Sequence, residues 1–512
     1  MFGLLRNERF LVISLFIAGI FSRLPFLEKM QSHWDGPNYT LGILHYSLVE
    51  RTPSPPGYPL YIFAGKVMHF FIADPHLSIL LVSVTFAGVG AIIFYLTGKI
   101  IFNTTVGIVA SLLFLSAPSL FYFGITANPY GILPSTATAL SLVVFMIIKF
   151  HKKYGILLGL VFAFALGIRP QDALFLTPLF ILGFFYLNNK QKILSLFGFL
   201  ALFIIWFLPV VITSGGIGKY ASYVDTFARN DANADFSIQR FFYITPIIIK
   251  GAYLTCGFGL LFLLFLLSKA AVYLKKPKKL VSKKVKPYFL VFSFWLIPAL
   301  AFNFFVRSDH AAHQMAYLSA MVLLCSFCIT KVSGKKAIVV TLVIVILNLF
   351  TFFRERDAQK IMPYVSQSFH YSEIVKNNIR MKSISEFINT KFSKENTIVI
   401  TDPEIFRQSS YYLMDFNVFA YGALDTSLPP HKDIVHRSYG GHYTLRYDKS
   451  HELAISSKVT EIVLINNNKE IRLLKGRVKK HILEGNAVIY SIRVLAGEKY
   501  LLSVHQIERI IR

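Results

Sequence analysis

The residues of this chain that could do chemistry lie in polar loops between long apolar segments. The stretch His33–Gly42 (HWDGPNYTLG) places Asp35 beside Trp34, shortly after the first apolar segment. A carboxylate in such a loop can take a proton from a hydroxyl group, cap the segment that follows, or pair with a nearby Lys or Arg. The proline-rich stretch Pro53–Tyr61 (PSPPGYPLY) comes next. Because each proline fixes φ, we expect it to form a rigid corner beside Asp35.

Basic residues follow several other apolar segments, where the next loop begins. Arg169 opens the loop RPQD, Arg307 opens RSDHAAHQ, and Lys219 lies in the glycine-bearing stretch SGGIGKY. A guanidinium can hold two phosphate oxygens at once, and glycine-bearing loops can cradle an anion. The alternative is that these side chains only reach toward lipid headgroups, as cations at span ends do. Asp172, in the same loop as Arg169, can be its ion-pair partner.

The loop that begins at Arg307 also contains two histidines. His310 and His313 are three residues apart and face the same way if the loop is helical, and Asp309 precedes them. Three interpretations stay open: a metal site, a grip on phosphate or sugar, or ordinary histidines at a membrane interface. The loop offers no third well-spaced ligand. We therefore expect no required metal or other cofactor, although a divalent metal remains an alternative.

Composition places these loops on a membrane protein. The chain has 512 residues, of which 54% are hydrophobic and 16% charged, with a mean hydropathy of +0.54. Runs of about 20 apolar residues, the length of a bilayer span, recur as far as Phe353 and predict about eleven spans. The net charge of +26 arises from 53 basic and 27 acidic residues. Since many of these charges flank the spans, we expect no nucleic-acid partner.

The basic clusters predict the orientation of the spans. Arg6 and Arg9 precede the first span, and further clusters lie in Lys149–Lys153, Lys275–Pro287 and Lys331–Lys336. All of them fall on one side if the spans alternate, and positive charge marks the cytoplasmic side. We therefore expect a multi-pass protein of the cytoplasmic membrane with a cytoplasmic N-terminus. The loops with Asp35, Arg169, Lys219 and Arg307 then lie outside.

The chain changes character after the last apolar run. Residues 1–353 form the predicted membrane domain, and residues 354–512 carry frequent charges and alternate strand-like with helix-like stretches. The strand-like runs are Asn396–Asp402, Val459–Asn467 and Asn486–Val494. This pattern predicts a small α/β domain outside the membrane. It contains no nucleotide-binding glycine motif, so we expect an accessory or acceptor-recognition role.

Short motifs of the membrane part resemble the polytopic GT-C glycosyltransferases, which use polyprenyl-phosphate-linked sugars. Protein O-mannosyltransferases, lipid A aminoarabinose transferases and DUF2723-like proteins belong to this class. The likeness is found in four segments: the first-loop acidic motif, the proline-rich segment and two later segments. Many protein O-mannosyltransferases have an Asp-Glu pair in the first loop, whereas Gly36 follows Asp35 here. The matching segments are HWDGPNYTLGI, PSPPGYPLYIFAGK, ALGIRPQDALFLTPLFIL and LIPALAFNFFVRSDHAAHQMAYL.

The resemblance implies a helical polytopic fold and an inverting transfer with Asp35 as general base. The donor would be a polyprenyl-phosphate-linked sugar, and the acceptor an extracytoplasmic glycan, lipid or protein. Cations would hold the departing phosphate, and aromatic and polar side chains would contact the sugar. The implied phosphate contacts are Arg169, Lys219, Arg307, His310 and His313, and the implied substrate contacts are Trp34, Tyr58, Asn128, Tyr130 and Asp172.

Three other functions are compatible with a polytopic chain. A polysaccharide polymerase or O-antigen ligase would centre its chemistry on a large outer loop, whereas this chain offers an acid in the first loop. A transporter or lipid flippase would carry charges within its spans or inverted repeats, and neither is evident. A membrane anchor for the C-terminal domain would need only one span.

Overall fold

The structure is a computed structural model, and the chain divides into two compact units. The first comprises Met1–Leu27 and Pro55–Ser372, and the second Glu28–Ser54 and Glu373–Arg512. This division groups the first loop with the C-terminal part. The described residues are 8–151, 153–231, 237–265, 285–306, 314–354, 369–401, 405–420, 452–453, 458–466, 478–494, 499–503 and 506–510.

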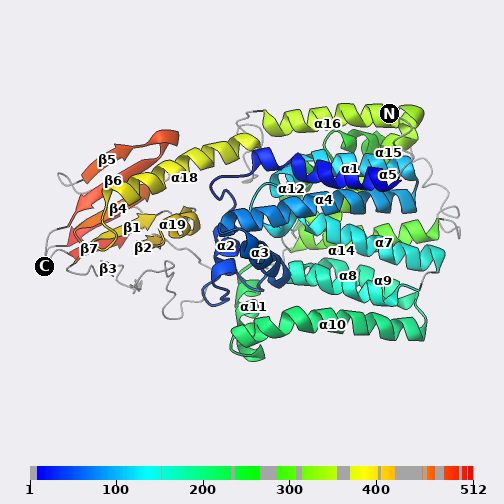
Figure 1. Cartoon of the computed structure of the whole chain (residues 1–512), viewed down its shortest axis with the longest axis horizontal. Coiled ribbons are helices and arrows are strands. Elements are labelled where there is room, and N and C mark those ends of the chain that lie inside the picture. Colours follow the sequence, from blue (N-terminus) through cyan, green and yellow to red (C-terminus); the bar gives the residue numbers. More distant parts are fainter. Residues whose placement is uncertain are drawn as a thin grey trace. The chain divides into compact units, whose positions relative to one another are not determined.

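The first unit is a bundle of helices (Figure 1). Short 3₁₀ turns precede α7 and α9, at η3 (Pro129–Gly131) and η4 (Pro170–Asp172). Its helices are α1 (Glu8–Phe21), α3 (Pro59–Phe71), α4 (Pro75–Ile101), α5 (Thr104–Ser116), α6 (Pro118–Phe123), α7 (Leu133–Phe150), α8 (Gly155–Ile168), α9 (Ala173–Phe185), α10 (Asn189–Thr213), α11 (Ile217–Asp231), α12 (Ile238–Cys256), α14 (Lys286–Phe305), α15 (Met315–Ser333) and α16 (Ala337–Phe353).

The length and composition of these helices define a multi-pass membrane protein. Among the described residues, six apolar helices are long enough to cross a bilayer, or seven if the bent pair α12 and Gly259–Phe265 is one span. This count takes Met315–Phe353 once, although α15 and α16 within it are separated by a turn at Gly334. Three shorter apolar helices lie among them. The expected number of about eleven spans is not confirmed.

Backbone breaks explain part of this difference. The apolar stretch over residues 105–123 is interrupted at Ala117 because Pro118, which has no N–H to donate, starts α6. Helix α12 begins at Ile238, and its chain bends by 117° after Cys256. Gly257 occupies the bend with φ +56°, a value that glycine adopts without strain.

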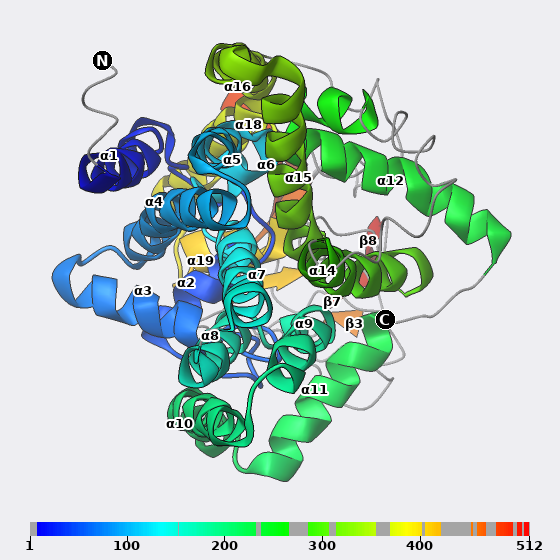
Figure 2. The same cartoon turned by 90° about the vertical axis from the view of Figure 1, so that its right-hand side faces the viewer.

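Close backbone contacts hold the bundle together. Figure 2 views the helices end-on and shows α7 in the middle, where it packs against α4, α8, α9, α14 and α15. Glycines let neighbouring helices approach at two crossings. Gly19 of α1 meets Gly88 of α4, and Gly159 of α8 meets the backbone of α10 at Ser195. Small residues are common at such crossings in membranes, where packing drives helix association.

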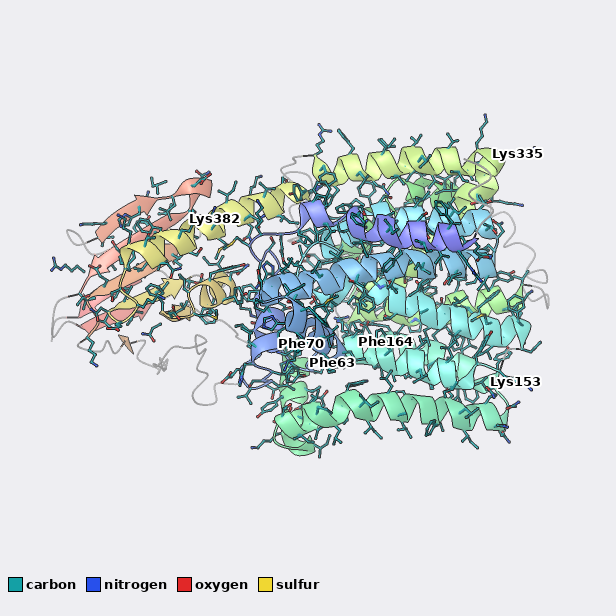
Figure 3. All side chains as sticks on the ribbon, viewed as in Figure 1. Phe63, Phe70, Lys153, Phe164, Lys335 and Lys382 are labelled. Carbon is teal, nitrogen blue, oxygen red and sulfur yellow. The ribbon has the colours of Figure 1, made fainter. Side chains whose placement is uncertain are left out.

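Lysines mark one end of the bundle. Lys153, before α8, and Lys335, before α16, lie at the same end in Figure 3. Lys149 in the last turn of α7 and Lys331 in the last turn of α15 lie at the helix ends that meet these starts. The end of α8 and the start of α7 lie at the other end of the bundle, where η3 and η4 are found. The basic clusters predicted from sequence therefore lie together where the structure describes them.

Helix α3 is too short to cross a bilayer. Its 13 residues span about 20 Å, against about 30 Å of hydrocarbon. Phe63 and Phe70 are exposed on it and are labelled in Figure 3, while Tyr61 and Ile62 are buried. One face thus packs on the bundle while aromatic side chains stay outside, as expected for a helix that lies along a membrane interface.

The second unit contains a mixed five-stranded sheet with the order β2-β1-β4-β6-β5. Strand β1 pairs in parallel with β2 and β4, whereas β6 runs antiparallel to β4 and β5. A second sheet has the order β3-β7-β8. The strands are β1 (Thr397–Thr401), β2 (Asn417–Ala420), β3 (Glu452–Leu453), β4 (Glu461–Asn466), β5 (Val478–Ile482), β6 (Val488–Arg493), β7 (Lys499–Ser503) and β8 (Gln506–Ile510).

Helices cover the larger sheet and complete its core. Helix α18 (Tyr371–Lys391) buries Met381, Ile384 and Ile388 against Val399 and Val463, at the spacing of one helical face. Helix α19 (Phe406–Tyr412) lies between β1 and β2 in the chain and contributes to the same core. The predicted α/β character of the C-terminal part is confirmed.

The first loop belongs to this second unit. Its helix α2 (Gly36–Leu44) packs against α19. Met30, just before α2, packs against the core formed by α18 and the sheet. The α/β unit, with which the first loop packs, therefore positions Asp35.

Candidate active site

Asp35 lies at the start of α2. The N–H of Tyr39 donates to the Asp35 carbonyl at 3.1 Å, and the N–H of Gly36 donates to the His33 carbonyl at 3.0 Å. The side chain of Asp35 pairs with Arg407 of α19, whose Nη1 donates to Oδ1. The sequence left three roles open for Asp35, namely proton acceptor, cap and ion-pair partner. The structure shows the ion pair. The two side chains are 20% and 15% exposed, so solvent still reaches the pair.

Trp34 completes the surroundings of this pair. The Cζ atom of Arg407 lies 4.8 Å from the centroid of the Trp34 ring, within the range of a cation–π contact. Arg407 thus contacts both a carboxylate and an aromatic face, a combination that its planar guanidinium suits better than an ammonium group does. In this structure the predicted sugar-stacking residue Trp34 contacts Arg407.

His33 supports the backbone of Asp35. The Asp35 N–H donates to His33 Nδ1 at 3.1 Å, which requires that nitrogen to be unprotonated. Burial lowers the pKa of His33 below its ordinary value of 6.5, although Asp35 and Glu28 oppose this change. A neutral ring with its proton on Nε2 therefore fits both observations.

Hydrogen bonds attach the residues before Asp35 to α18 and α19. The Met30 N–H donates to Asn378 Oδ1 at 2.8 Å, and the Asn377 amide donates to the Gln31 carbonyl at 3.0 Å. The Gln31 N–H donates to the Tyr412 hydroxyl at 2.7 Å. These bonds join parts of the chain that are some 350 residues apart in sequence, and they fix the approach of the chain to Asp35.

A second group of predicted residues lies in the helical unit, at the end of the bundle opposite the lysines. Arg169, at the end of α8, donates from Nη1 to Asp172 Oδ1 at 2.8 Å, and both side chains are almost fully buried. The Arg169 Cζ atom lies 5.7 Å from the centroid of Tyr130, and Gln171 donates to the Tyr58 hydroxyl at 3.3 Å. We call these five residues the Arg169 cluster. The possible ion pair of Arg169 with Asp172 is confirmed.

Backbone geometry fixes the aromatic members of the cluster. Tyr58 starts α3 with φ +48°, directly after Gly57 with φ +113°, so the proline-rich stretch turns sharply there. Asn128 is buried, and its Oδ1 accepts from the Tyr130 N–H at 2.9 Å. The Asn128 side chain therefore holds Tyr130 in place. The Tyr220 hydroxyl of α11 reaches the Pro56 carbonyl at 3.5 Å.

The remaining predicted residues differ in what the structure says of them. Lys219 is exposed near the start of α11, and Gly215 lies beside the end of its side chain. Arg307, His310 and His313 lie outside the described residues. Among the described residues no group of three or more His, Cys, Asp or Glu side chains could hold a metal ion.

The sequence did not indicate Arg407, and it indicated His33 only by position. Arg407 is 372 residues from Asp35 in the chain, with no motif to connect them. His33 precedes Asp35 by two residues, which is the distance of a local side-chain contact in a turn. That spacing was the available signal for the histidine.

The comparisons with known proteins agree with this architecture. Residues 54–213 match the family model described as dolichyl-phosphate-mannose-protein mannosyltransferase. This segment contains the proline-rich corner and every member of the Arg169 cluster. No curated protein matches the chain by sequence. The resemblance to GT-C glycosyltransferases is therefore confirmed over this segment.

Solved structures with this fold include two of ArnT from Cupriavidus metallidurans. The structure bound to undecaprenyl phosphate has a TM-score of 0.55 and 10% sequence identity, and covers 94% of this chain and 96% of that one. The apo structure has a TM-score of 0.53 and 12% identity, and covers 94% and 97%. The chain thus has the ArnT-like fold, including a C-terminal domain.

Proposed function

We propose that the chain is an integral-membrane glycosyltransferase that transfers a sugar from a polyprenyl-phosphate donor to an extracytoplasmic acceptor, with inversion. The observation that carries this proposal is the ArnT-like fold over 94% of the chain. The family-model match over residues 54–213 supports a transferase of the same class. The ArnT structure is bound to undecaprenyl phosphate, which supports a polyprenyl-linked donor.

Asp35 is the proposed general base. As the acceptor hydroxyl attacks the anomeric carbon, a new glycosidic C–O bond forms and the C–O bond to the donor phosphate breaks. The hydroxyl proton passes to Asp35, and the bonding electrons leave with the polyprenyl phosphate. Phosphate is already a good leaving group, so this step requires cations rather than a strong acid. The partial exposure of Asp35 supports its access to an acceptor.

Cations of the helical unit are the proposed contacts of the departing phosphate. Lys219 is exposed, so its ammonium group is accessible to a phosphate oxygen. Arg169 is already paired with Asp172 through Nη1, but its buried Nε has no hydrogen-bond partner among the described residues. That N–H is available to a phosphate oxygen. Tyr58 and Tyr130, which border Arg169, are proposed to contact the sugar, and Arg307, His310 and His313 remain proposed phosphate contacts.

We place the protein in the cytoplasmic membrane, with its lysine-marked end in the cytoplasm. The gathering of Lys149, Lys153, Lys331 and Lys335 at one end of the bundle supports this orientation. The Arg169 cluster lies at the other end and would then face the exterior. Lipid-linked donors would reach it from the outer leaflet.

The test is transfer by membranes that contain the Asp35→Asn variant, supplied with a panel of labelled polyprenyl-phosphate pentoses and hexoses. Asparagine preserves the shape of the side chain but cannot take the proton, so we expect stable protein and loss of glycoside formation. Asp415→Asn is the matched control, because Asp415 is in the same unit and also pairs with a cation, Lys394. It is expected to retain transfer.

Two outcomes would contradict the proposal. Unchanged transfer by the Asp35→Asn variant would remove this residue from the mechanism. Uptake of labelled donor into vesicles without a new glycosidic bond would identify a transporter instead.

A further inference from the structure

The α/β unit surrounds Asp35 with groups from distant parts of the chain. Arg407 comes from α19, whereas Asn378 and Tyr412 hold the residues just before Asp35. A domain that only recognised acceptors would have no need to contact the first loop so extensively. Asn378 and Tyr412 fix the backbone that leads to Asp35, and Arg407 contacts the carboxylate itself, which suggests that the domain acts on that group.

We propose that Arg407 is a positioning residue for Asp35, so that the C-terminal part of the chain completes the active site. This inference rests on the proposed function, in which Asp35 takes the acceptor proton. Arg407 has two effects on that carboxylate. Its Nη1–H donates to Asp35 and fixes the orientation of the side chain, and its positive charge favours the ionised carboxylate over the protonated form.

The fold holds Arg407 itself in place. Its neighbour Phe406 and the nearby Leu413 are buried in the core of the α/β unit. Helix α19 follows β1, which runs parallel to β2, so Arg407 lies after the carboxyl end of a parallel strand, where such sheets commonly place functional groups. Stacking on Trp34 restricts the guanidinium further. The arginine is thus ordered before any substrate binds.

Glu28 and His33 are the other titratable groups beside Asp35 and Arg407. Glu28 is buried nearby and accepts from the Ser32 N–H at 2.7 Å. His33 accepts from the Asp35 N–H, and burial lowers the pKa of its imidazole. Among the described contacts, Arg407 is the cation that pairs with the Asp35 carboxylate. Removing its charge is therefore expected to let Asp35 take up a proton at a higher pH.

Two substitutions separate the charge of Arg407 from its geometry. Arg407→Gln keeps a neutral hydrogen-bond donor but removes the charge, and Arg407→Lys keeps the charge but loses the planar fork. We expect Arg407→Gln to move the acidic limb of the pH–rate profile upward by at least about one pH unit. We expect Arg407→Lys to leave the limb nearly in place while its plateau rate falls, on the order of 10²-fold at most.

Lys394→Gln is the matched control. It removes the cation of another ion pair of the same unit, the exposed pair with Asp415, and is expected to change neither the limb nor the plateau. A Lys394→Gln profile with the same limb shift as Arg407→Gln would overturn the inference, because the shift would then reflect the total charge of the unit. An unchanged limb and plateau in Arg407→Gln would also overturn it. Faster transfer by Arg407→Gln at neutral pH would overturn the inference as well, since Arg407 would then restrain Asp35.

A second measurement does not depend on activity. Thermal unfolding of purified Asp35→Asn, Arg407→Gln and the double variant forms a double-mutant cycle. If the two side chains interact, the double variant loses less stability than the two single variants lose together. Additive changes would overturn the inference. If Asp35→Asn transfers normally, the proposed role of Asp35 as the base fails, and this cycle still decides whether the pair exists. If Asp35→Asn is inactive and Arg407→Gln is normal, only the role of Arg407 fails.

Discussion

Arg169 and Asp172 form an ion pair inside the helical unit, with 2.8 Å between Nη1 and Oδ1 and almost no exposure of either side chain. Breaking such a pair leaves one buried charge without its counter-ion, whereas removing both charges avoids that cost. We therefore expect Asp172→Asn to destabilise the protein by about 3 kcal/mol or more. The measurement is thermal unfolding of the purified protein in detergent.

The double variant Arg169→Met/Asp172→Leu tests the physical reason for that loss. It replaces both charges with apolar side chains of similar size, so most of the lost stability is expected to return. Transfer activity should not return with it, because the proposed phosphate contact of Arg169 is gone. A double variant that is less stable than Asp172→Asn would show that the pair stabilises the fold in its own right.

The burial of His33 predicts that the free energy of unfolding of the protein depends on pH. Burial lowers the pKa of His33 in the folded protein below its ordinary value of 6.5, which the unfolded chain retains. Well above pH 6.5 both states are neutral at this residue, so it contributes no pH dependence there. As the pH falls below 6.5 the unfolded state takes up the proton first, and stability decreases until the folded pKa is passed.

His33→Asn tests this expectation. Asparagine can offer an oxygen where His33 Nδ1 accepts from the Asp35 N–H, but it does not titrate. We expect the midpoint of thermal unfolding to fall less between pH 7 and pH 5 in this variant than in the wild type. Glu28, Asp35 and Arg407 surround the residue and remain in both proteins. Parallel curves for the two proteins would contradict the predicted burial of a neutral imidazole.

The close approach of α8 and α10 at Gly159 leaves no room for a side chain. A methyl group at Gly159 would lie 2.0 Å from the Ser195 carbonyl oxygen, so α8 and α10 would have to separate. We expect Gly159→Ala to destabilise the protein by about 1–3 kcal/mol, the usual cost of overpacking. Gly218→Ala is the matched control, because nothing lies within 4 Å of its added methyl. The comparison uses thermal unfolding, and equal midpoints would contradict the tight crossing.

The sequence predicted the elements of the α/β unit well. The strand-like runs Asn396–Asp402, Val459–Asn467 and Asn486–Val494 correspond to β1, β4 and β6, because buried central strands read as short apolar runs. One of the helix-like stretches that alternate with them corresponds to α18. Local patterns were sufficient for these elements, since each is defined by the residues within it.

The site could be predicted only in part. Asp35 was found because it lies in a short motif, and the partnership of Arg169 with Asp172 followed from their spacing. The pair of Asp35 with Arg407 depends on how the first loop packs against α19, and no local pattern contains that information. The number of spans was not settled by hydropathy, which does not register breaks such as the one at Pro118.

The proposed orientation can be tested with single cysteines. Lys153 lies before α8, at the lysine-marked end, and Lys219 lies after α10, whose first turn carries Lys190 and Lys192. If that end is cytoplasmic, a membrane-impermeant maleimide should label Lys219→Cys in intact cells and Lys153→Cys only after permeabilisation. The native thiols of Cys256, Cys325 and Cys328 are buried, so the background should be low. Labelling in the reverse order would place the Arg169 cluster in the cytoplasm, where an outer-leaflet donor could not reach it.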